Sequence, residues 1–174
     1  MKQKIKIAVI ILIILVLSFF YAHIDKNTYL YDREVDSGDY AATGILLENE
    51  EISQDFVCEE DSIDGINIKI TVYGNADETE VQYRIVDKEN GQTLGEGTAA
   101  GESVKNNKFN KLKMDQIDGT KGKQCTLIIQ EKGSDEENGL GFYTIVDSEN
   151  TTVIRENETR RSLAVRMVCR RFDL

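Results

Sequence analysis

Two short acidic segments are the first candidates for chemistry in this 174-residue chain. The segments EEDSIDG and GSDEENG carry carboxylate and amide oxygens, which are the hard donors that Ca²⁺ prefers. Neither segment has the spacing of an EF-hand loop, so we predict at most a structural calcium site and no other cofactor. The candidate ligands are Glu59, Glu60, Asp61 and Asp64 in the first segment and Asp135, Glu136, Glu137 and Asn138 in the second.

Catalytic chemistry has few other candidates. The single histidine, His23, lies beside a long apolar run near the N-terminus, so no Ser-His-Asp or Cys-His arrangement falls in the C-terminal part of the chain. Carboxylates are plentiful, but no spacing singles out a glycosidase-like pair, and charged runs are commonly solvated surface. The glycine-rich GQTLGEGTAAG lacks the Gly-Lys-Ser/Thr ending of a phosphate loop and is expected to connect strands. We therefore expect no enzyme activity.

The apolar run beside His23 predicts a membrane anchor. A basic head over residues 1–6 precedes an uncharged run over residues 7–22. As a helix this run would cover roughly 24 Å, slightly less than the roughly 30 Å hydrocarbon core, and lysine snorkelling can close the gap. A cleaved signal peptide is the alternative, but the best cleavage site, after Ala22, has the bulky Phe20 where a small residue is required. We expect an uncleaved anchor with a cytoplasmic N-terminus and an extracytoplasmic C-terminal domain.

The segment after the anchor, residues 23–43, has neither helical nor strand periodicity. We expect a loosely ordered juxtamembrane linker, in which Tyr29, Tyr31 and Tyr40 rest either on the lipid interface or on the domain that follows.

The exported part of the chain is strongly acidic. Residues 1–26 hold four of the 21 basic residues and one of the 31 acidic residues, so the remainder carries about −13. A surface of this charge predicts that the protein binds neither nucleic acid nor anionic lipid.

Residues 44–174 have the pattern of an all-β domain. GINIKITVYG alternates apolar and polar residues, as a half-buried strand does, and EVQYRIVD, QCTLIIQ and SLAVRMVCR repeat this pattern. GFYTIVD predicts a further strand, and Asn90-Gly91 suits a hairpin turn. Hardly any helix is expected after the anchor, which predicts one β-sandwich domain.

This domain resembles the jelly-roll, galactose-binding-like or carbohydrate-binding-like modules found beside transmembrane segments in bacterial envelope proteins. The resemblance covers roughly residues 44–174, and Cys125 departs from it by standing where an aromatic residue is usual. The family's motif positions are occupied by Gln54 and Phe56; Ile63, Gly65 and Ile66; Phe109, Leu112, Met114 and Ile117; and Gly122 and Lys123. Leu112 and Met114 depart from the pattern, because they stand where the family has aromatic rings.

The resemblance implies a jelly-roll fold and a ligand class. Related jelly rolls often bind carbohydrate, which makes a glycan the leading ligand, and Tyr73 and Tyr143 are the candidate stacking rings on the outward phase of two strands. If the first and last strands pair, as in many jelly rolls, Cys58 can meet Cys169 in a disulfide. Buried free thiols are the alternative for these cysteines and are expected for Cys125.

Two functions are predicted on this basis. The first is a membrane-anchored binding or accessory module of the bacterial cell envelope that contacts glycans. The second is a structural subunit that packs against other membrane proteins and binds no small molecule or glycan.

Overall fold

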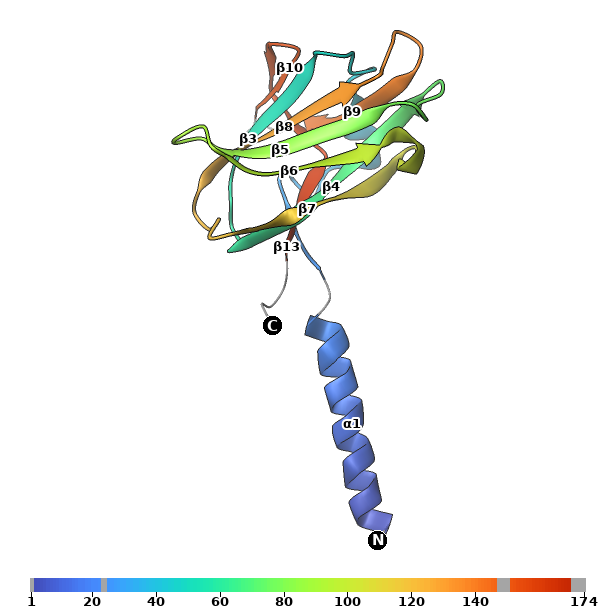
Figure 1. The fold of residues 1–174 in the computed structure, drawn as a ribbon, viewed down its shortest axis with the longest axis vertical. Helices are drawn as coiled ribbons and strands as arrows, with labels where there is room; N and C mark the ends of the chain where they lie inside the picture. The colour runs from blue at the N-terminus through green and yellow to red at the C-terminus, as the bar shows by residue number, and fades with distance from the viewer. Residues whose placement is uncertain (1, 23–24, 147–150, 170–174) are drawn as a thin grey trace.

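The computed structural model describes residues 2–22, 25–146 and 151–169. It consists of one N-terminal helix, α1 (Lys2–Ala22), followed by an all-β domain of two packed antiparallel sheets (Figure 1). The predicted β-sandwich architecture is therefore confirmed. Two short 3₁₀ helices interrupt the strands, at Ser37–Asp39 and Gly101–Ser103.

Within the described residues, the first sheet has seven strands and the second has six. The first sheet contains β1 (Lys26–Tyr29), β2 (Tyr40–Ala42), β4 (Ser62–Tyr73), β7 (Lys108–Asp118), β9 (Gly139–Val146), β12 (Arg161–Leu163) and β13 (Val165–Cys169). The second sheet contains β3 (Glu51–Val57), β5 (Glu80–Asp87), β6 (Thr93–Ala100), β8 (Gln124–Lys132), β10 (Thr152–Ile154) and β11 (Asn157–Thr159).

The alternating segments of the sequence supply the core between the sheets. Ile66, Ile68 and Ile70 of β4 are fully buried, as the alternation predicted. They belong to the same apolar cluster as Leu127 and Ile129 of β8 in the other sheet. Burial of such side chains is the main stabilising contribution, at about 1.5–3 kcal/mol for each.

The predicted hairpin at Asn90-Gly91 is confirmed, but its turn is longer than a two-residue connection. Residues 88–92 join β5 to β6, and Gly91 has φ +72°. Its N–H donates to the carbonyl of Asp87 over 2.8 Å. The left-handed conformation required at this position explains the glycine.

The predicted linker over residues 23–43 is wrong for its described part, because this segment belongs to the sandwich. β1 pairs with β13, β2 pairs with β9, and Tyr31 is buried. The domain therefore begins at Lys26 and not at Gly44. Strands of four and three residues are too short to show periodicity, and their stability comes from backbone pairing.

The helix α1 extends away from the end of the sandwich at which β13 finishes (Figure 1). Its large apolar side chains, from Ile5 to Tyr21, are exposed on every side of the helix. In the part of the chain that the structure describes, no helix combines the length and the apolar character that a bilayer crossing requires.

Candidate functional site

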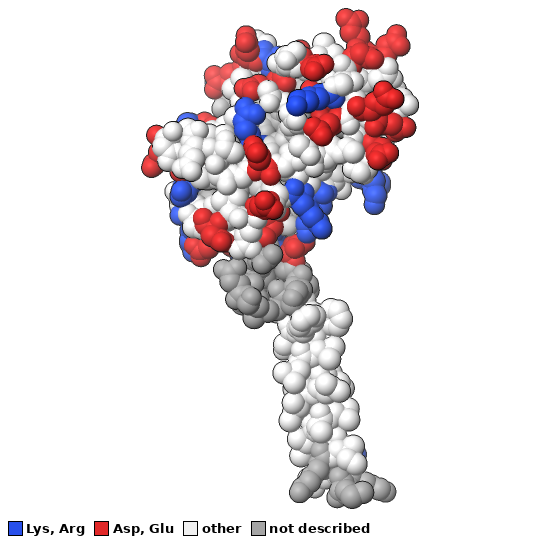
Figure 2. All heavy atoms as spheres, in the orientation of Figure 1, with Lys and Arg blue, Asp and Glu red and all other residues white. Residues whose placement is uncertain are grey.

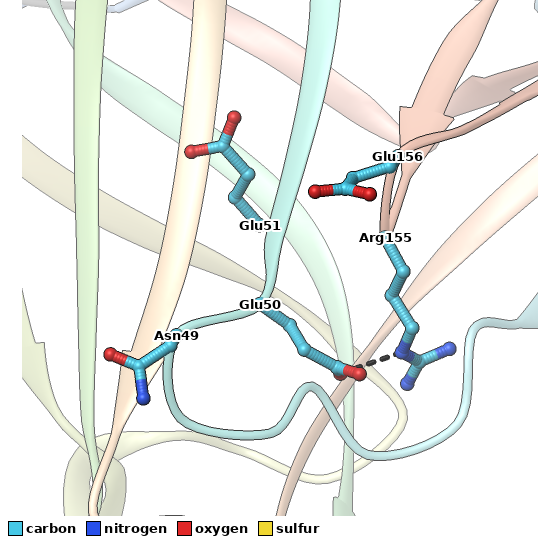
Figure 3. Close-up of a pocket in the computed structure, with 5 residues that line it drawn as sticks. All are labelled: Asn49, Glu50, Glu51, Arg155 and Glu156. Carbon is cyan, nitrogen blue, oxygen red and sulfur yellow. Dashed lines mark hydrogen bonds and ion pairs between the residues drawn. The ribbon is translucent and has the colours of Figure 1, made fainter.

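A polar pocket lies where the start of β3 meets the turn between β10 and β11 (Figure 3). Its volume is about 370 Å³, within the range of small-molecule sites. The lining residues are Asn49, Glu50, Glu51, Arg155 and Glu156. All five have hydrogen-bonding or charged side chains, so the pocket suits a polar ligand.

Arg155 joins the two walls of this polar pocket. Its Nε donates a 2.6 Å hydrogen bond to Glu50 Oε2, and its terminal nitrogens donate to the carbonyls of Thr43 and Ile45. The N–H of Arg155 also donates to the carbonyl of Glu51 over 3.1 Å. The guanidinium thus fixes the position of the β10–β11 turn against the segment before β3.

The backbone of the pocket is unusual. Asn49, Arg155 and Glu156 have φ angles of +73°, +49° and +65°. Residues other than glycine rarely adopt this left-handed region, and it costs about 1–2 kcal/mol per residue. Arg155 and Glu156 form a two-residue hairpin turn with both φ angles positive, where Asn-Gly is preferred. Conformations of this kind are concentrated at functional sites.

The carboxylates of the pocket differ in their environments. Burial acts to raise the pKa of Glu50, but hydrogen bonds from Arg155 and from the N–H of Leu47 outweigh it and hold that pKa below its usual range. Glu51 lies 3.8 Å from a terminal nitrogen of Arg84. Among the described residues, Glu156 has no ion-pair partner, and its side chain extends from the turn toward β3 (Figure 3). Glu51 and Glu156 can therefore accept hydrogen bonds from a ligand.

The two predicted stacking tyrosines lie on the outer face of the first sheet, and neither has a fully open ring. Tyr143 is half-buried, with the Lys69 ammonium 4.7 Å from its ring centroid and Tyr40 packed edge-on at 6.3 Å. Its hydroxyl donates to Asn107. Tyr73 is also half-buried and lies over Gly141 of β9. Tyr143 is therefore already engaged by neighbours from its own chain.

The predicted calcium ligands do not come together. Glu59 and Asp61 lie near the segment that leads into β8, and Asp64 lies at the irregular part of β4 that pairs with β7, whereas Asp135 and Glu137 follow the end of β8. The two ends of β8 are separated by nine residues of strand, roughly 30 Å. The Asp135 carboxylate instead accepts hydrogen bonds from the N–H groups of Glu137 and Asn138, both over 2.8 Å.

No group of three or more His, Cys, Asp or Glu side chains is placed to hold a metal ion within the described part of the chain. The prediction of a calcium site from either acidic segment is therefore not supported. His23 lies outside the described residues.

All three cysteines are buried free thiols, so the predicted Cys58–Cys169 disulfide is not formed in this structure. Burial, with the nearby Cys58 as the next contribution, raises the pKa of Cys169 to about 12 and that of Cys125 to about 11. Thiols with such pKa values remain protonated at neutral pH, which makes them poor nucleophiles.

A buried glutamate that the sequence analysis did not single out lies between the sheets. Glu131 of β8 is 1% exposed, and both of its carboxylate oxygens lie 3.0 Å from the N–H of Leu140. Burial raises the pKa of Glu131 to about 7, and the hydrogen bonds from Leu140 and the Thr79 side chain offset this only in part. The alternation of apolar and polar residues in β8 places position 131 on the inward face, so the sequence pattern could have indicated that Glu131 is buried.

No protein-family model matches this sequence, and no curated protein matches it either.

Proposed function

We propose that this chain is a membrane-anchored, extracytoplasmic β-sandwich binding module of the bacterial cell envelope. The main support for the proposal is that an apolar helix and a folded β-sandwich are joined by a very short connection. A helix with apolar side chains exposed on every side leads directly into the first strand of a folded sandwich, with only residues 23–25 between α1 and β1.

The surface of α1 supports insertion into a bilayer. A helix in water normally exposes a polar face, whereas the large side chains of α1 from Ile5 to Tyr21 are apolar and exposed. The lysines at its start would remain in the cytoplasm, which sends the sandwich outside. Lysine snorkelling and the aromatic residues Phe19, Phe20 and Tyr21 would compensate for the modest length of the uncharged run.

The polar pocket supports a glycan as the ligand class. Sugars present many hydroxyl groups, and the carboxylates of Glu51 and Glu156 and the amide of Asn49 are suitable partners for hydroxyls. Arg155 fixes the turn that carries Glu156 against the segment before β3 in the absence of a ligand, and such preorganisation lowers the entropic cost of binding. The resemblance of the domain to carbohydrate-binding-like jelly rolls favours the same ligand class. We propose binding without turnover.

Retention of the full chain on immobilised cell-wall and capsular polysaccharides tests this proposal. The protein is kept in neutral detergent, and the variant Glu51→Gln with Glu156→Gln is compared with the charge-matched control Glu136→Gln with Glu158→Gln. We expect about tenfold weaker retention for the pocket variant, since each lost charged hydrogen bond costs about 1.5–3 kcal/mol before partial replacement by the amide. The control should bind like the unmodified chain. Equal retention of all three proteins, or retention of none, would contradict glycan binding in this pocket.

A structural subunit that packs against other membrane proteins is the second candidate. The exposed apolar surface of α1 favours it, because an inserted helix can pack against partner helices as well as against lipid. Co-purification of one defined membrane protein that is lost when the α1 side chains are altered, together with no glycan retention, would favour this function over the first.

A further inference from the structure

A second groove, between β6 and β7, has the opposite charge to the rest of the domain. Its volume is about 570 Å³, and three lysines line it, Lys105, Lys111 and Lys113. Among the described residues that line this groove, none is acidic. We call it the lysine groove. Such a basic site stands out because residues 27–174 together carry a net charge of about −13.

The lysine groove lies where an edge of one sheet meets an edge of the other. β6 pairs only with β5 and β7 pairs only with β4 among the described strands. Edge strands present N–H groups that no neighbouring strand accepts. Thr98 and Ser103 add hydroxyl groups to the lining, and Phe109 adds an apolar wall. The groove therefore combines positive charge, hydrogen-bond donors and an apolar surface.

The buried Asn110 fixes the loop that carries Lys105. Its Oδ1 accepts the N–H of Lys105 over 2.8 Å, and its Nδ2 donates to the carbonyls of Lys105 and Lys108 over 3.0 and 2.9 Å. Within the described part of the chain, Lys105 and Lys113 have no ion-pair partner. Two of the three ammonium groups are thus free to meet an anion.

The third lysine links the groove to the helix. Lys111 forms an ion pair with Asp25, which is three residues beyond the end of α1 at Ala22. Three residues span at most roughly 11 Å of chain, so the groove cannot be far from the end of α1. Figure 1 places β7 on the side of the sandwich nearest α1, and Figure 2 shows acidic side chains both on the part farthest from α1 and on the part beside it.

We propose that the lysine groove binds a phosphate group, and that the phosphate belongs to an anionic lipid headgroup of the bilayer that holds α1. The membrane source rests on the proposed anchoring by α1. Lysines near a bilayer surface are attracted to anionic headgroups, and the ion pair of Lys111 with Asp25 places that part of the groove near the end of α1. The acidic composition predicted no attraction to anionic lipid, but the described lining of this groove holds three lysines and no acidic residue, and β7 lies on the side of the sandwich nearest the helix.

Amine acylation of the full chain in vesicles tests the proposal. Acylation of each lysine is quantified by mass spectrometry in phosphatidylcholine vesicles, in the same vesicles with inorganic phosphate, and in vesicles containing phosphatidylglycerol. We expect Lys105 and Lys113 to react about fivefold more slowly with phosphatidylglycerol present, as expected for one lysine held at an anionic surface. Lys108 is exposed on the same strand but does not line the groove, so its reactivity should not change.

A pair of variants provides the control for this measurement. In the unmodified chain, Lys111 should also be protected by phosphatidylglycerol beyond the effect of its ion pair with Asp25. In Lys105→Gln with Lys113→Gln, Lys111 should lose this added protection, whereas the charge-matched variant Lys121→Gln with Lys132→Gln should keep it. Equal protection of Lys111 in both variants would overturn the assignment of the phosphate to the groove.

The remaining outcomes distinguish an error in the source of the phosphate from an error in the proposed membrane anchoring. Protection by inorganic phosphate without any effect of phosphatidylglycerol would overturn the lipid source, and unchanged acylation in every condition would overturn phosphate binding. Alkaline washing of the same vesicles reports on the anchor alone, because a chain released by it contradicts the proposed function whatever the lysine reactivities show.

Discussion

Arg155 Nε donates a hydrogen bond to Glu50 Oε2 over 2.6 Å, between two residues that are 105 positions apart in the chain. This contact links the two walls of the polar pocket, the β10–β11 turn and the start of β3. It also accompanies a backbone conformation that a hairpin turn without glycine rarely adopts. The arrangement predicts opposite effects for substitutions at the two residues of the turn.

Arg155→Ala should destabilise the domain by about 1–3 kcal/mol, because the Glu50 carboxylate and two carbonyls lose a charged donor. The free energy of unfolding of the full chain in detergent, measured by urea denaturation, checks this value. Arg160→Ala is the control, since Arg160 is exposed and should contribute little. Equal stability of the two variants would show that the Arg155 contacts contribute nothing.

Glu156→Gly should stabilise the domain by about 0.5–1 kcal/mol. Glycine adopts the observed φ of +65° without strain, and this gain exceeds the extra entropy that glycine loses on folding. The midpoint of urea denaturation should rise with an unchanged slope. A lower midpoint would mean that the Glu156 side chain contributes more to stability than its backbone strain costs.

Glu131 should make stability depend on pH. Because its pKa rises from 4.5 in the unfolded chain to about 7 in the folded domain, its contribution is most favourable below pH 4.5 and is lost as the pH rises to about 7. Glu131→Gln should remove this loss and gain stability over the unmodified chain at pH 8, by no more than about 3 kcal/mol. Unfolding free energies at pH 5 and pH 8 measure the difference, and parallel pH profiles for the two proteins would refute this role.

Gly97→Ala should destabilise the contact between β6 and β7 by about 1–3 kcal/mol through overpacking. A Cβ atom at position 97 would lie 2.5 Å from Tyr83 Oη and 2.7 Å from the carbonyl oxygen of Lys113. The Tyr83 hydroxyl donates to that same carbonyl, so neither atom can move freely. Gly38→Ala is the matched control, because nothing lies within 4 Å of its added Cβ. Equal midpoint temperatures of thermal unfolding for the two variants would contradict the close approach of position 97 to Tyr83 and Lys113.

The sandwich could be predicted because its longer strands alternate apolar and polar residues in the sequence. Ile66, Ile68 and Ile70 are buried as their spacing indicated. β1 and β2 were not predicted, because they have only four and three residues. Each is held by pairing with a strand more than 100 positions away in the chain. Pairing between such distant segments leaves no local pattern in the residues themselves.

The candidate site was less predictable than the fold. The acidic segments suggested calcium because of their many carboxylates, but a calcium site requires several oxygens to converge on one point. Within the described residues, neither segment takes part in a group of three or more such side chains that could hold a metal ion. The polar pocket brings Glu50 together with Arg155, and neither stands out in its local sequence. The sequence feature that could have indicated this pocket is Arg155-Glu156, because this pair is unusual in a two-residue hairpin turn. The turn can be recognised only when the flanking strands β10 and β11 are known.

The mass and location of the chain in isolated membranes test the central claim most directly. After alkaline washing, the anchored module should remain in the membrane fraction at the mass of the full chain, 19.7 kDa. Protease added from the outside should then remove the sandwich and leave α1 protected in the bilayer. A shortened product in the soluble fraction, cut near the end of α1, would contradict the anchor and with it the proposed placement of the binding module.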